Sequence, residues 1–301
     1  MKITTARSCP SLPVCACRAL VLILGLASAL LLAQDQPLAA PPSPVAAAGL
    51  TDAQKAMLQG KMGDMVQVLA SAGGIKLVPI PAGSFLMGSP ADEAGRKDNE
   101  GPQTQVTFTK GFFIGATDVT QDLYEAVVGS NPSYFKKPKS PVERISWEDA
   151  MAFCQKLTER EQAAGRLPAA LAFTLPTEAQ WEYACRAGTT GRFAGDFDAM
   201  AWYIKNCDST THPVAQKKPN AWGLYDMYGN VAEWCLDWYD AKLPGGAATD
   251  PTGPAAGTGR VTRGGGWWLF SGDCRSASRS HFPQDDRDHD VGLRLVLSEN
   301  K

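Results

Sequence analysis

The order of apolar and polar residues predicts short β-strands after residue 75. In 105–120, QVTFTKGFFIGATDVT, apolar and polar side chains alternate, which is typical of a strand with one buried face. In 76–89, KLVPIPAGSFLMGS, two apolar runs flank a turn made by Pro81, Ala82 and Gly83. We therefore expect a strand on each side of that turn and further strand structure in 105–120.

Three later segments carry the start and stop signals of helices. They are 120–129, 146–165 and 175–188. Ser146 and Thr177 each have an acidic or amide side chain three residues later, and this pairing satisfies the free amides at the start of a helix. A glycine ends each segment. These signals predict three helices.

Beyond residue 188 the pattern predicts only short strands and turns rich in Gly, Pro and Asn. The fold class is therefore α+β, irregular and rich in ordered loops. Large aromatic side chains are spread through these loops, which indicates that the loops are packed rather than disordered. The tryptophans concerned are Trp181, Trp202, Trp222, Trp234, Trp238, Trp267 and Trp268.

The N-terminal region predicts export. Residues 1–33 have basic residues before an apolar run at 19–33, which is typical of a signal peptide and short for a membrane span. A retained anchor is the alternative, and contact with a membrane depends on it. Residues 34–50 are a Pro/Ala spacer, 51–74 predict a short helix, and 75–298 predict one domain. We expect a periplasmic or secreted protein.

Charge and cysteine spacing exclude several functions. Three of the 29 basic side chains and none of the 31 acidic ones lie in the signal, so the mature chain is acidic. It shows no basic stripe, so we expect no nucleic-acid partner. The lack of a C-x-x-C pair argues against a zinc ribbon or a thioredoxin-type site. The cysteines after the signal are Cys154, Cys185, Cys207, Cys235 and Cys274.

Several phrases in order resemble the formylglycine-generating enzyme family, or sulfatase-modifying factor family, over nearly all of 75–298. The resemblance implies an irregular fold related to C-type lectins. It also implies oxygen and copper(I) chemistry that converts a sulfatase cysteine to formylglycine. The phrases are IPAGSFLMGS, VTQDLYEAVVG, PVERISWEDAMAFCQKL, LPTEAQWEYACRAG, NAWGLYDMYGNVAEWCLDWY, RVTRGGGWW and VGLRLVL.

This chain departs from the family at the copper site. Copper(I) favours thiolate ligands, and the family's enzymes carry two cysteines separated by four residues. The matching stretch, 263–280, has only Cys274, and Gly266 stands where the family has serine. We therefore do not expect copper, and Cys274 is a weak catalytic candidate. The resemblance of CRSASRS and YACRAG to the family instead implies a structural disulfide between Cys185 and Cys274.

The stretch 223–240, GLYDMYGNVAEWCLDWYD, offers a second candidate site. Asp226 and Glu233 flank a Gly-Asn turn, so their carboxylates could form a calcium cage, an acid/base pair or part of a packed turn. The resemblance implies calcium, which would bind the side chains of Asp226 and Glu233 and the carbonyls of Gly229 and Val231. We therefore expect a structural calcium ion.

The C-terminal region contains two further groups. His281 and His289 lie near several aspartates, the ingredients of a two-His, one-carboxylate iron site. We interpret this segment as a solvated charged loop and do not expect iron. The other group either borders a peptide-binding groove, as the resemblance implies, or ties down loop carbonyls. It consists of Trp267, Trp268, Arg275 and Arg279.

These observations leave three functions open for an exported protein of this family. One is a binding module for a protein or peptide. Another is a divergent oxidative enzyme, an oxygen-dependent oxidoreductase acting on a protein or peptide. The alternative is a copper-dependent formylglycine generator, which the single cysteine of 263–280 disfavours. Whether the chain is an enzyme stays open at this point.

Overall fold

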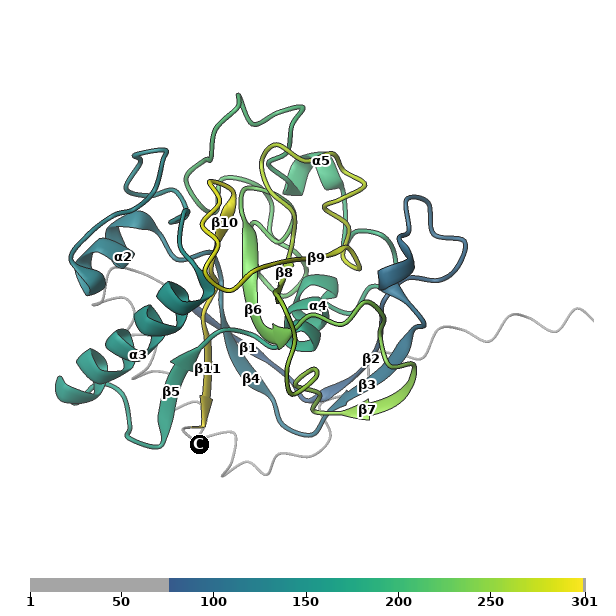
Figure 1. Cartoon of the computed structure of the whole chain (residues 1–301), viewed down its shortest axis with the longest axis horizontal. Coiled ribbons are helices and arrows are strands. Elements are labelled where there is room, and N and C mark those ends of the chain that lie inside the picture. Colours follow the sequence, from purple (N-terminus) through teal and green to yellow (C-terminus); the bar gives the residue numbers. More distant parts are fainter. Residues whose placement is uncertain (1–75, 300–301) are drawn as a thin grey trace, which may run out of the picture. The chain divides into compact units, whose positions relative to one another are not determined.

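The computed structural model describes residues 76–299, which form sixteen helices and strands (Figure 1). The signal at 1–33, the spacer at 34–50 and the helix expected at 51–74 lie outside the described residues, as does residue 75. The elements in order are β1 Leu77–Ile80, β2 Gly83–Met87, the 3-10 helix η1 Asp98–Glu100, β3 Thr104–Phe108, β4 Phe112–Gly115, α2 Gln121–Val128, α3 Trp147–Ala163, β5 Leu171–Thr174, α4 Glu178–Arg186, α5 Phe197–Met200, β6 Ala232–Trp238, β7 Gly246–Thr249, β8 Arg260–Arg263, β9 Arg279–Phe282, β10 Val291–Gly292 and β11 Val296–Glu299.

The three predicted helices are confirmed as α2, α3 and α4, and two of them begin with a complete capping box. Ser146 Oγ accepts from the Asp149 amide at 3.0 Å, and Thr177 Oγ1 accepts from the Gln180 amide at 3.1 Å. Each box satisfies two amides that the helix itself cannot pair. The expectation of no helix after residue 188 is wrong at α5, because one isolated turn carries no periodic signal.

The strands form three small sheets (Figure 1). Their orders are β1-β4-β11-β5, β10-β6-β8-β9 and β2-β3-β7. The C-terminal strand β11 lies between β4 and β5, where Val296 pairs with both Ile114 and Thr174. Strand β6 is central in the second sheet, antiparallel to β8 and parallel to β10. This sheet carries the acidic-aromatic stretch into the interior.

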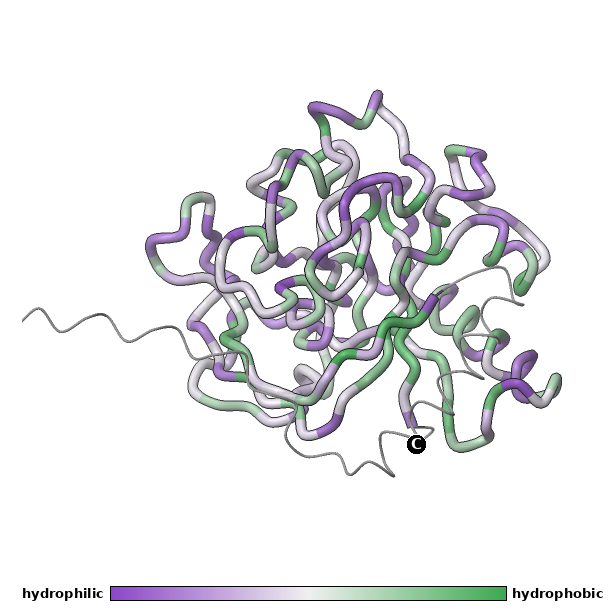
Figure 2. The backbone as a smooth tube through the Cα atoms, turned by 180° about the vertical axis from the view of Figure 1, so that it is seen from behind, coloured by the Kyte–Doolittle hydropathy of each residue, from purple (hydrophilic) through white to green (hydrophobic). Residues whose placement is uncertain are grey.

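Two clusters of apolar side chains form the core. Trp234 of β6 belongs to one and Trp181 of α4 to the other, and both are fully buried. Their ring nitrogens are satisfied, since Trp234 donates to the Ile145 carbonyl at 3.0 Å and Trp181 donates to Glu233 Oε2 at 2.8 Å. Figure 2 shows that hydrophobic positions follow the inner strands while hydrophilic ones lie mainly in the outer loops.

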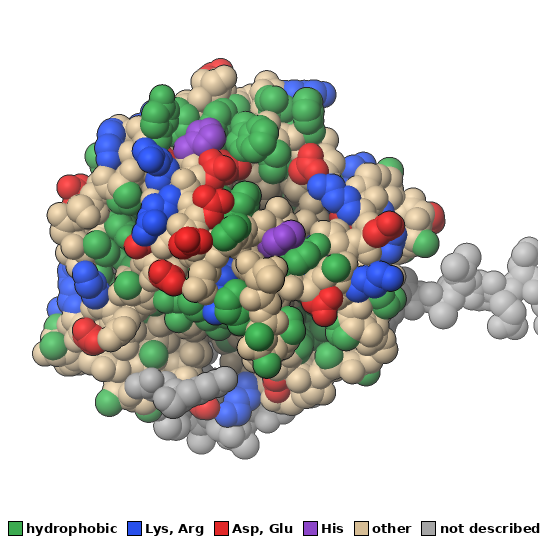
Figure 3. Space-filling model, viewed as in Figure 1, with side chains coloured by type: hydrophobic (Ala, Val, Ile, Leu, Met, Phe, Trp, Pro, Cys, Tyr) green, Lys and Arg blue, Asp and Glu red, His purple; other side chains and the backbone are tan. Residues whose placement is uncertain are grey.

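The face seen in Figure 3 carries acidic and basic side chains interspersed with hydrophobic ones. Among residues 76–299, no helix is both long enough and apolar enough to cross a membrane.

Candidate functional site

Glu233 of β6 is committed to an internal ion pair. Arg294 Nε lies 2.8 Å from Glu233 Oε2, and Arg294 Nη2 lies 2.7 Å from Oε1. Trp181 Nε1 adds a third donor, and the side chains of Glu233 and Arg294 are fully buried. Paired, bidentate hydrogen bonds of this kind stabilise a buried carboxylate strongly. Both oxygens of Glu233 are therefore already engaged by donors from the protein itself.

Two further carboxylates lie near the same guanidinium. Asp226 adopts a left-handed backbone conformation with φ 57°, and its Oδ2 accepts from the Ala215 amide at 2.8 Å, while its Oδ1 is buried without a partner among the described residues. Asp118 Oδ1 lies 3.7 Å from Arg294 Nη2. Burial, together with the charge of Glu233, raises the pKa of both aspartates, that of Asp226 to about 6.

The calcium cage expected from the resemblance stays a prediction, and one feature of this arrangement weighs against it. Arg294 places its positive charge against both oxygens of Glu233, so a calcium ion bound there would displace the guanidinium or face its repulsion. Gly229 is needed for another reason, because a side chain there would overlap the carbonyl of Trp202. Within 76–299, no three or more His, Cys, Asp and Glu side chains are grouped to hold a metal ion.

Cys274 and Cys185 are buried free thiols in the structure, so the predicted disulfide is absent there. Cys185 Sγ lies 4.0 Å from the Met227 carbonyl, whereas Cys274 Sγ lies against Gly265, where an added Cβ would be 2.6 Å away. Burial raises the pKa of Cys274 to about 12, which favours the protonated thiol at neutral pH and makes it a poor nucleophile.

Arg275 and Arg279 do not border the pocket at Trp267, which corrects the groove interpretation for both. Arg275 donates to Glu93 at 2.5 Å, to Glu100 Oε2 at 2.7 Å and to the Gly95 carbonyl at 2.7 Å. Arg279 binds both oxygens of Glu178, at 2.6 and 2.8 Å. Both guanidinium groups are buried and hold loops together.

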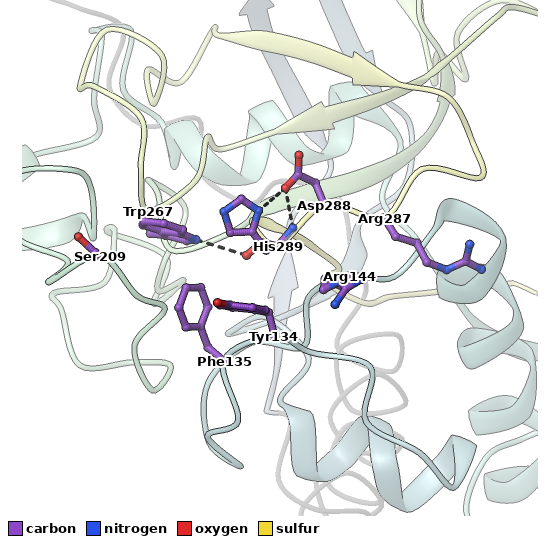
Figure 4. Close-up of a pocket in the computed structure, with 8 residues that line it drawn as sticks. All are labelled: Tyr134, Phe135, Arg144, Ser209, Trp267, Arg287, Asp288 and His289. Atoms are coloured by element: carbon purple, nitrogen blue, oxygen red, sulfur yellow. Dashed lines mark hydrogen bonds and ion pairs between the residues drawn. The ribbon is translucent and has the colours of Figure 1, made fainter.

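A pocket of about 540 Å³ lies beside Trp267 (Figure 4). The rings of Phe135 and His289 pack against the indole at centroid distances of 5.4 and 5.3 Å, both at steep angles. Tyr134 packs edge-on against Phe135 at 5.0 Å. The walls thus come from separate loops and are mainly aromatic. The lining residues are Tyr134, Phe135, Arg144, Ser209, Trp267, Arg287, Asp288 and His289.

The glycine run before Trp267 sets the position of its ring. Gly264 and Gly265 have φ of 94° and 73°, which side chains rarely tolerate. A side chain at Gly266 would overlap Asp290, whose carboxylate accepts a hydrogen bond from Trp268 Nε1. Trp267 itself is held from the turn before β10, because its ring nitrogen donates to the His289 carbonyl at 3.3 Å.

The opposite wall is held by a buried carboxylate. Glu143 Oε1 accepts from the Phe135 amide at 2.8 Å, and the Glu143 amide donates to Ser133 Oγ at 3.2 Å. Burial raises the pKa of Glu143. These bonds fix the loop that presents Tyr134, whose side chain is 65% exposed. The aromatic wall is therefore in place without a ligand.

The charged groups of the pocket differ in their availability. His289 Nδ1 lies 2.5 Å from Asp288 Oδ1, and Arg287 Nε binds Asp149 Oδ2 at 2.9 Å. Figure 4 shows Arg287 directed away from Trp267. Arg144 is exposed, and among residues 76–299 its charge acts on the neighbouring Glu143 without a direct ion pair. It is the pocket cation that is available to a ligand.

The histidines have separate surroundings. His281 of β9 stacks on Tyr239 at 3.9 Å, whereas His289 packs against Trp267 at 5.3 Å. Of the predicted groove, Trp267 lines the pocket and Trp268 lies beside it, 45% exposed. Sequence reasoning missed Tyr134, Phe135 and Arg144. The available signal was an adjacent aromatic pair in the polar loop NPSYFKKPK, where neither ring has a periodic partner.

The mixed sheets, irregular loops and loop-lined pocket define an α+β fold of the sulfatase-modifying-factor type, which is C-type-lectin-like. The chain belongs to the sulfatase-modifying factor enzyme 1-like domain family, whose family model matches residues 70–299. The resemblance and the fold class predicted from the sequence are therefore confirmed.

The chain is similar to formylglycine-generating enzymes and also to proteins whose names indicate other roles. The chaperone protein LppX of Paenibacillus barcinonensis is 30% identical, over 62% of this chain and 80% of the relative. The formylglycine-generating enzyme of Mus musculus is 28% identical, over 73% and 74%. Among solved structures, Treponema denticola variable protein 1 is 33% identical with a TM-score of 0.66, and PvdO from Pseudomonas aeruginosa is 28% identical with 0.65. Each match covers 74% of this chain and 94% of the solved chain.

Proposed function

We propose that this protein is an exported binding module that holds a segment of another protein in the pocket beside Trp267. The observation that carries the proposal is the pocket's composition: four rings, Arg144 and no cysteine. Aromatic side chains with an arginine are the groups most often found where binding energy concentrates. The rings are fixed by the chain's own hydrogen bonds, so little ordering is needed when a ligand binds.

The state of the cysteines supports a binding role over copper-dependent oxidation. All five cysteines in the described residues are buried, and 263–280 contains only one of them, Cys274. An oxidase of the copper type needs thiolates beside its substrate. The relatives allow a binding role, since one carries the name chaperone and another the name variable protein. If the predicted signal at 1–33 directs export, the ligand of the pocket would be a protein outside the cytoplasm.

The test is selection of displayed random 12-residue peptides on the immobilised protein. We expect enrichment of a consensus by the wild type and its loss with Trp267→Ala, because the indole forms the centre of the wall. Trp222→Ala is the matched control, since this indole packs on Tyr183 outside the pocket. Each variant is first checked for native near-UV circular dichroism. Enrichment that survives Trp267→Ala contradicts the proposed pocket.

A second arm tests the alternative reaction. The protein is incubated with a peptide containing C-x-P-x-R, copper(I) and oxygen, and the peptide mass is then measured. We expect the cysteine to stay unmodified while a formylglycine-generating enzyme converts it in parallel. Conversion by this chain would replace the binding proposal with an enzymatic one and would require a thiolate that the structure does not present.

A further inference from the structure

A second cavity, of about 370 Å³, lies between sheet β2-β3-β7 and the end of β6. It shares no lining residue with the pocket beside Trp267. Its walls are mostly apolar: Met87 and Val106 come from β2 and β3, and prolines come from the loop that flanks β7. Leu243 closes one side and is buried. An alkyl chain would find hydrophobic contact along these walls.

Three carboxyl groups line this cavity, and Asp237 is the buried one that forms no ion pair with a described residue. Asp237 of β6 is only 5% exposed. Its Oδ2 accepts from the Glu178 amide at 2.8 Å, and no other residue of 76–299 donates a hydrogen bond to its Oδ1. The loop that contains Gly253 passes close to this oxygen, since a Cβ added at Gly253 would lie 2.8 Å from it. Glycine has no side chain that could donate a hydrogen bond there.

The two arginines near Asp237 make their direct contacts with other groups. Arg279 binds both oxygens of Glu178 and donates to the carbonyls of Asn99 and Asp240. Arg260 lies between the rings of Trp147 and Trp238 and donates to the Leu236 carbonyl at 2.7 Å. The remaining charged lining groups are Asp240 and Lys242, and Lys242 is exposed at the rim.

Arg279 and Arg260 act on Asp237 only through space, without a direct ion pair, and a buried carboxylate in that position is costly; a cationic ligand in contact with it would reduce that cost. Burial and the neighbouring Glu178 raise the pKa of Asp237 to about 7. The group is therefore divided between its two forms near neutral pH. A ligand ammonium would favour the ionised form and would donate to the oxygen that accepts no hydrogen bond from another described residue.

We propose that this cavity is a binding site for an alkylammonium group, with the ammonium against Asp237 and the alkyl chain along Met87, Val106 and Leu243. The same chemistry occurs in a lysine side chain of a protein and in a free amine. An anion is disfavoured, because the lining carboxyl groups of Glu178, Asp237 and Asp240 outnumber the two cations.

The experiment is calorimetric titration of the purified protein with n-pentylamine and, separately, with Nα-acetyl-lysine methylamide. We expect binding of both and a loss of about 30-fold or more in Asp237→Asn, because the charge partner is removed. Asp285→Asn, which neutralises an exposed carboxylate outside the cavity, is the matched control and should leave the affinity unchanged. Tighter binding of the capped lysine indicates a protein side chain as the natural ligand, and tighter binding of pentylamine indicates a free amine.

The pH dependence sharpens the test. Affinity should rise from pH 6 to pH 8, since Asp237 ionises in this interval while the amine stays protonated. The rise should vanish in Asp237→Asn. Ala248→Phe, which adds a ring to the cavity wall and keeps Asp237, should also block binding. Trp267→Ala should leave it intact, which separates this site from the peptide pocket. Absence of binding to the wild type, or equal binding to Asp237→Asn, overturns the proposal.

Discussion

Strand β6 carries two buried carboxyl groups with opposite roles. Glu233 is fully buried, and Arg294 and Trp181 occupy both of its oxygens. Asp237, four residues further along, lines a cavity and has one oxygen without a donor from another described residue. Burial alone therefore does not distinguish a structural acid from a binding one. The distinction lies in whether the protein supplies the counter-charge.

The largest effect should come from breaking the paired acid. We expect Glu233→Ala to lower the free energy of unfolding by about 3 to 5 kcal/mol, because it leaves the Arg294 guanidinium buried and without its main partner. Urea denaturation followed by tryptophan fluorescence measures the change. Glu125→Ala, on the exposed side of α2, is the control and should change the value little. A loss below about 1 kcal/mol would contradict the structural role of the pair.

Replacing Asp237 should raise the free energy of unfolding above neutral pH, whereas replacing Glu233 should lower it. The pKa of Asp237, about 7 in the folded state, is raised above its ordinary value, so its stabilising contribution is present at pH 4 and is lost as pH rises through 7. Asp237→Asn removes this loss. At pH 8 the variant should be more stable than the wild type by about 1 to 3 kcal/mol. Urea titrations at pH 4, 6 and 8 test this, and equal pH profiles would show that Asp237 is ionised throughout.

A smaller pH effect is expected at Asp290 beside Trp268. Burial raises the pKa of Asp290 to about 6, so the wild type should lose stability as pH rises from 4 through 6. Asp290→Asn should weaken that dependence by about 1 to 2 kcal/mol while its amide oxygen still accepts from Trp268. The melting temperature measured between pH 4 and pH 7.5 reports the difference. A steeper dependence in the variant would reverse the assigned sign.

The smallest effect should follow chelation. Because Arg294 already neutralises Glu233, EDTA should leave the melting temperature unchanged, and added calcium should not raise it. Differential scanning calorimetry with each addition gives the answer. A calcium-dependent rise that Asp226→Ala abolishes would restore the cage expected from the family resemblance.

The helices and the family could be predicted because their signals are local. Ser146 and Thr177 form the capping boxes that their sequence spacing indicates. The partners of Glu233 could not be predicted in this way, since Arg294 is distant in the sequence and the family resemblance favoured calcium. Likewise Arg275 and Arg279 lie near Trp267 in the sequence, yet their side chains bind Glu100 and Glu178. Side-chain pairing across loops depends on the completed fold.

Only part of the pocket beside Trp267 could be predicted from the sequence, because its walls also form by side-chain contacts between distant loops. Trp267 stood out as an adjacent pair with Trp268, but its partners Phe135 and His289 come from loops on either side of the chain's middle. Nothing in the spacing of these three residues indicates that their rings meet. The residues that most directly form a binding surface in such a fold are therefore those whose sequence pattern is least informative.

The position of β11 has a consequence for how the protein reaches this state. Strand β11 lies between β4 and β5, so Ile114 finds its partner Val296 only after the chain has been made as far as β11. Contacts between such distant residues slow folding, because the ends of a long loop must first be brought together. A growing chain therefore cannot complete this sheet before β11 is made. Removing β11 would leave the facing edges of both β4 and β5 unpaired.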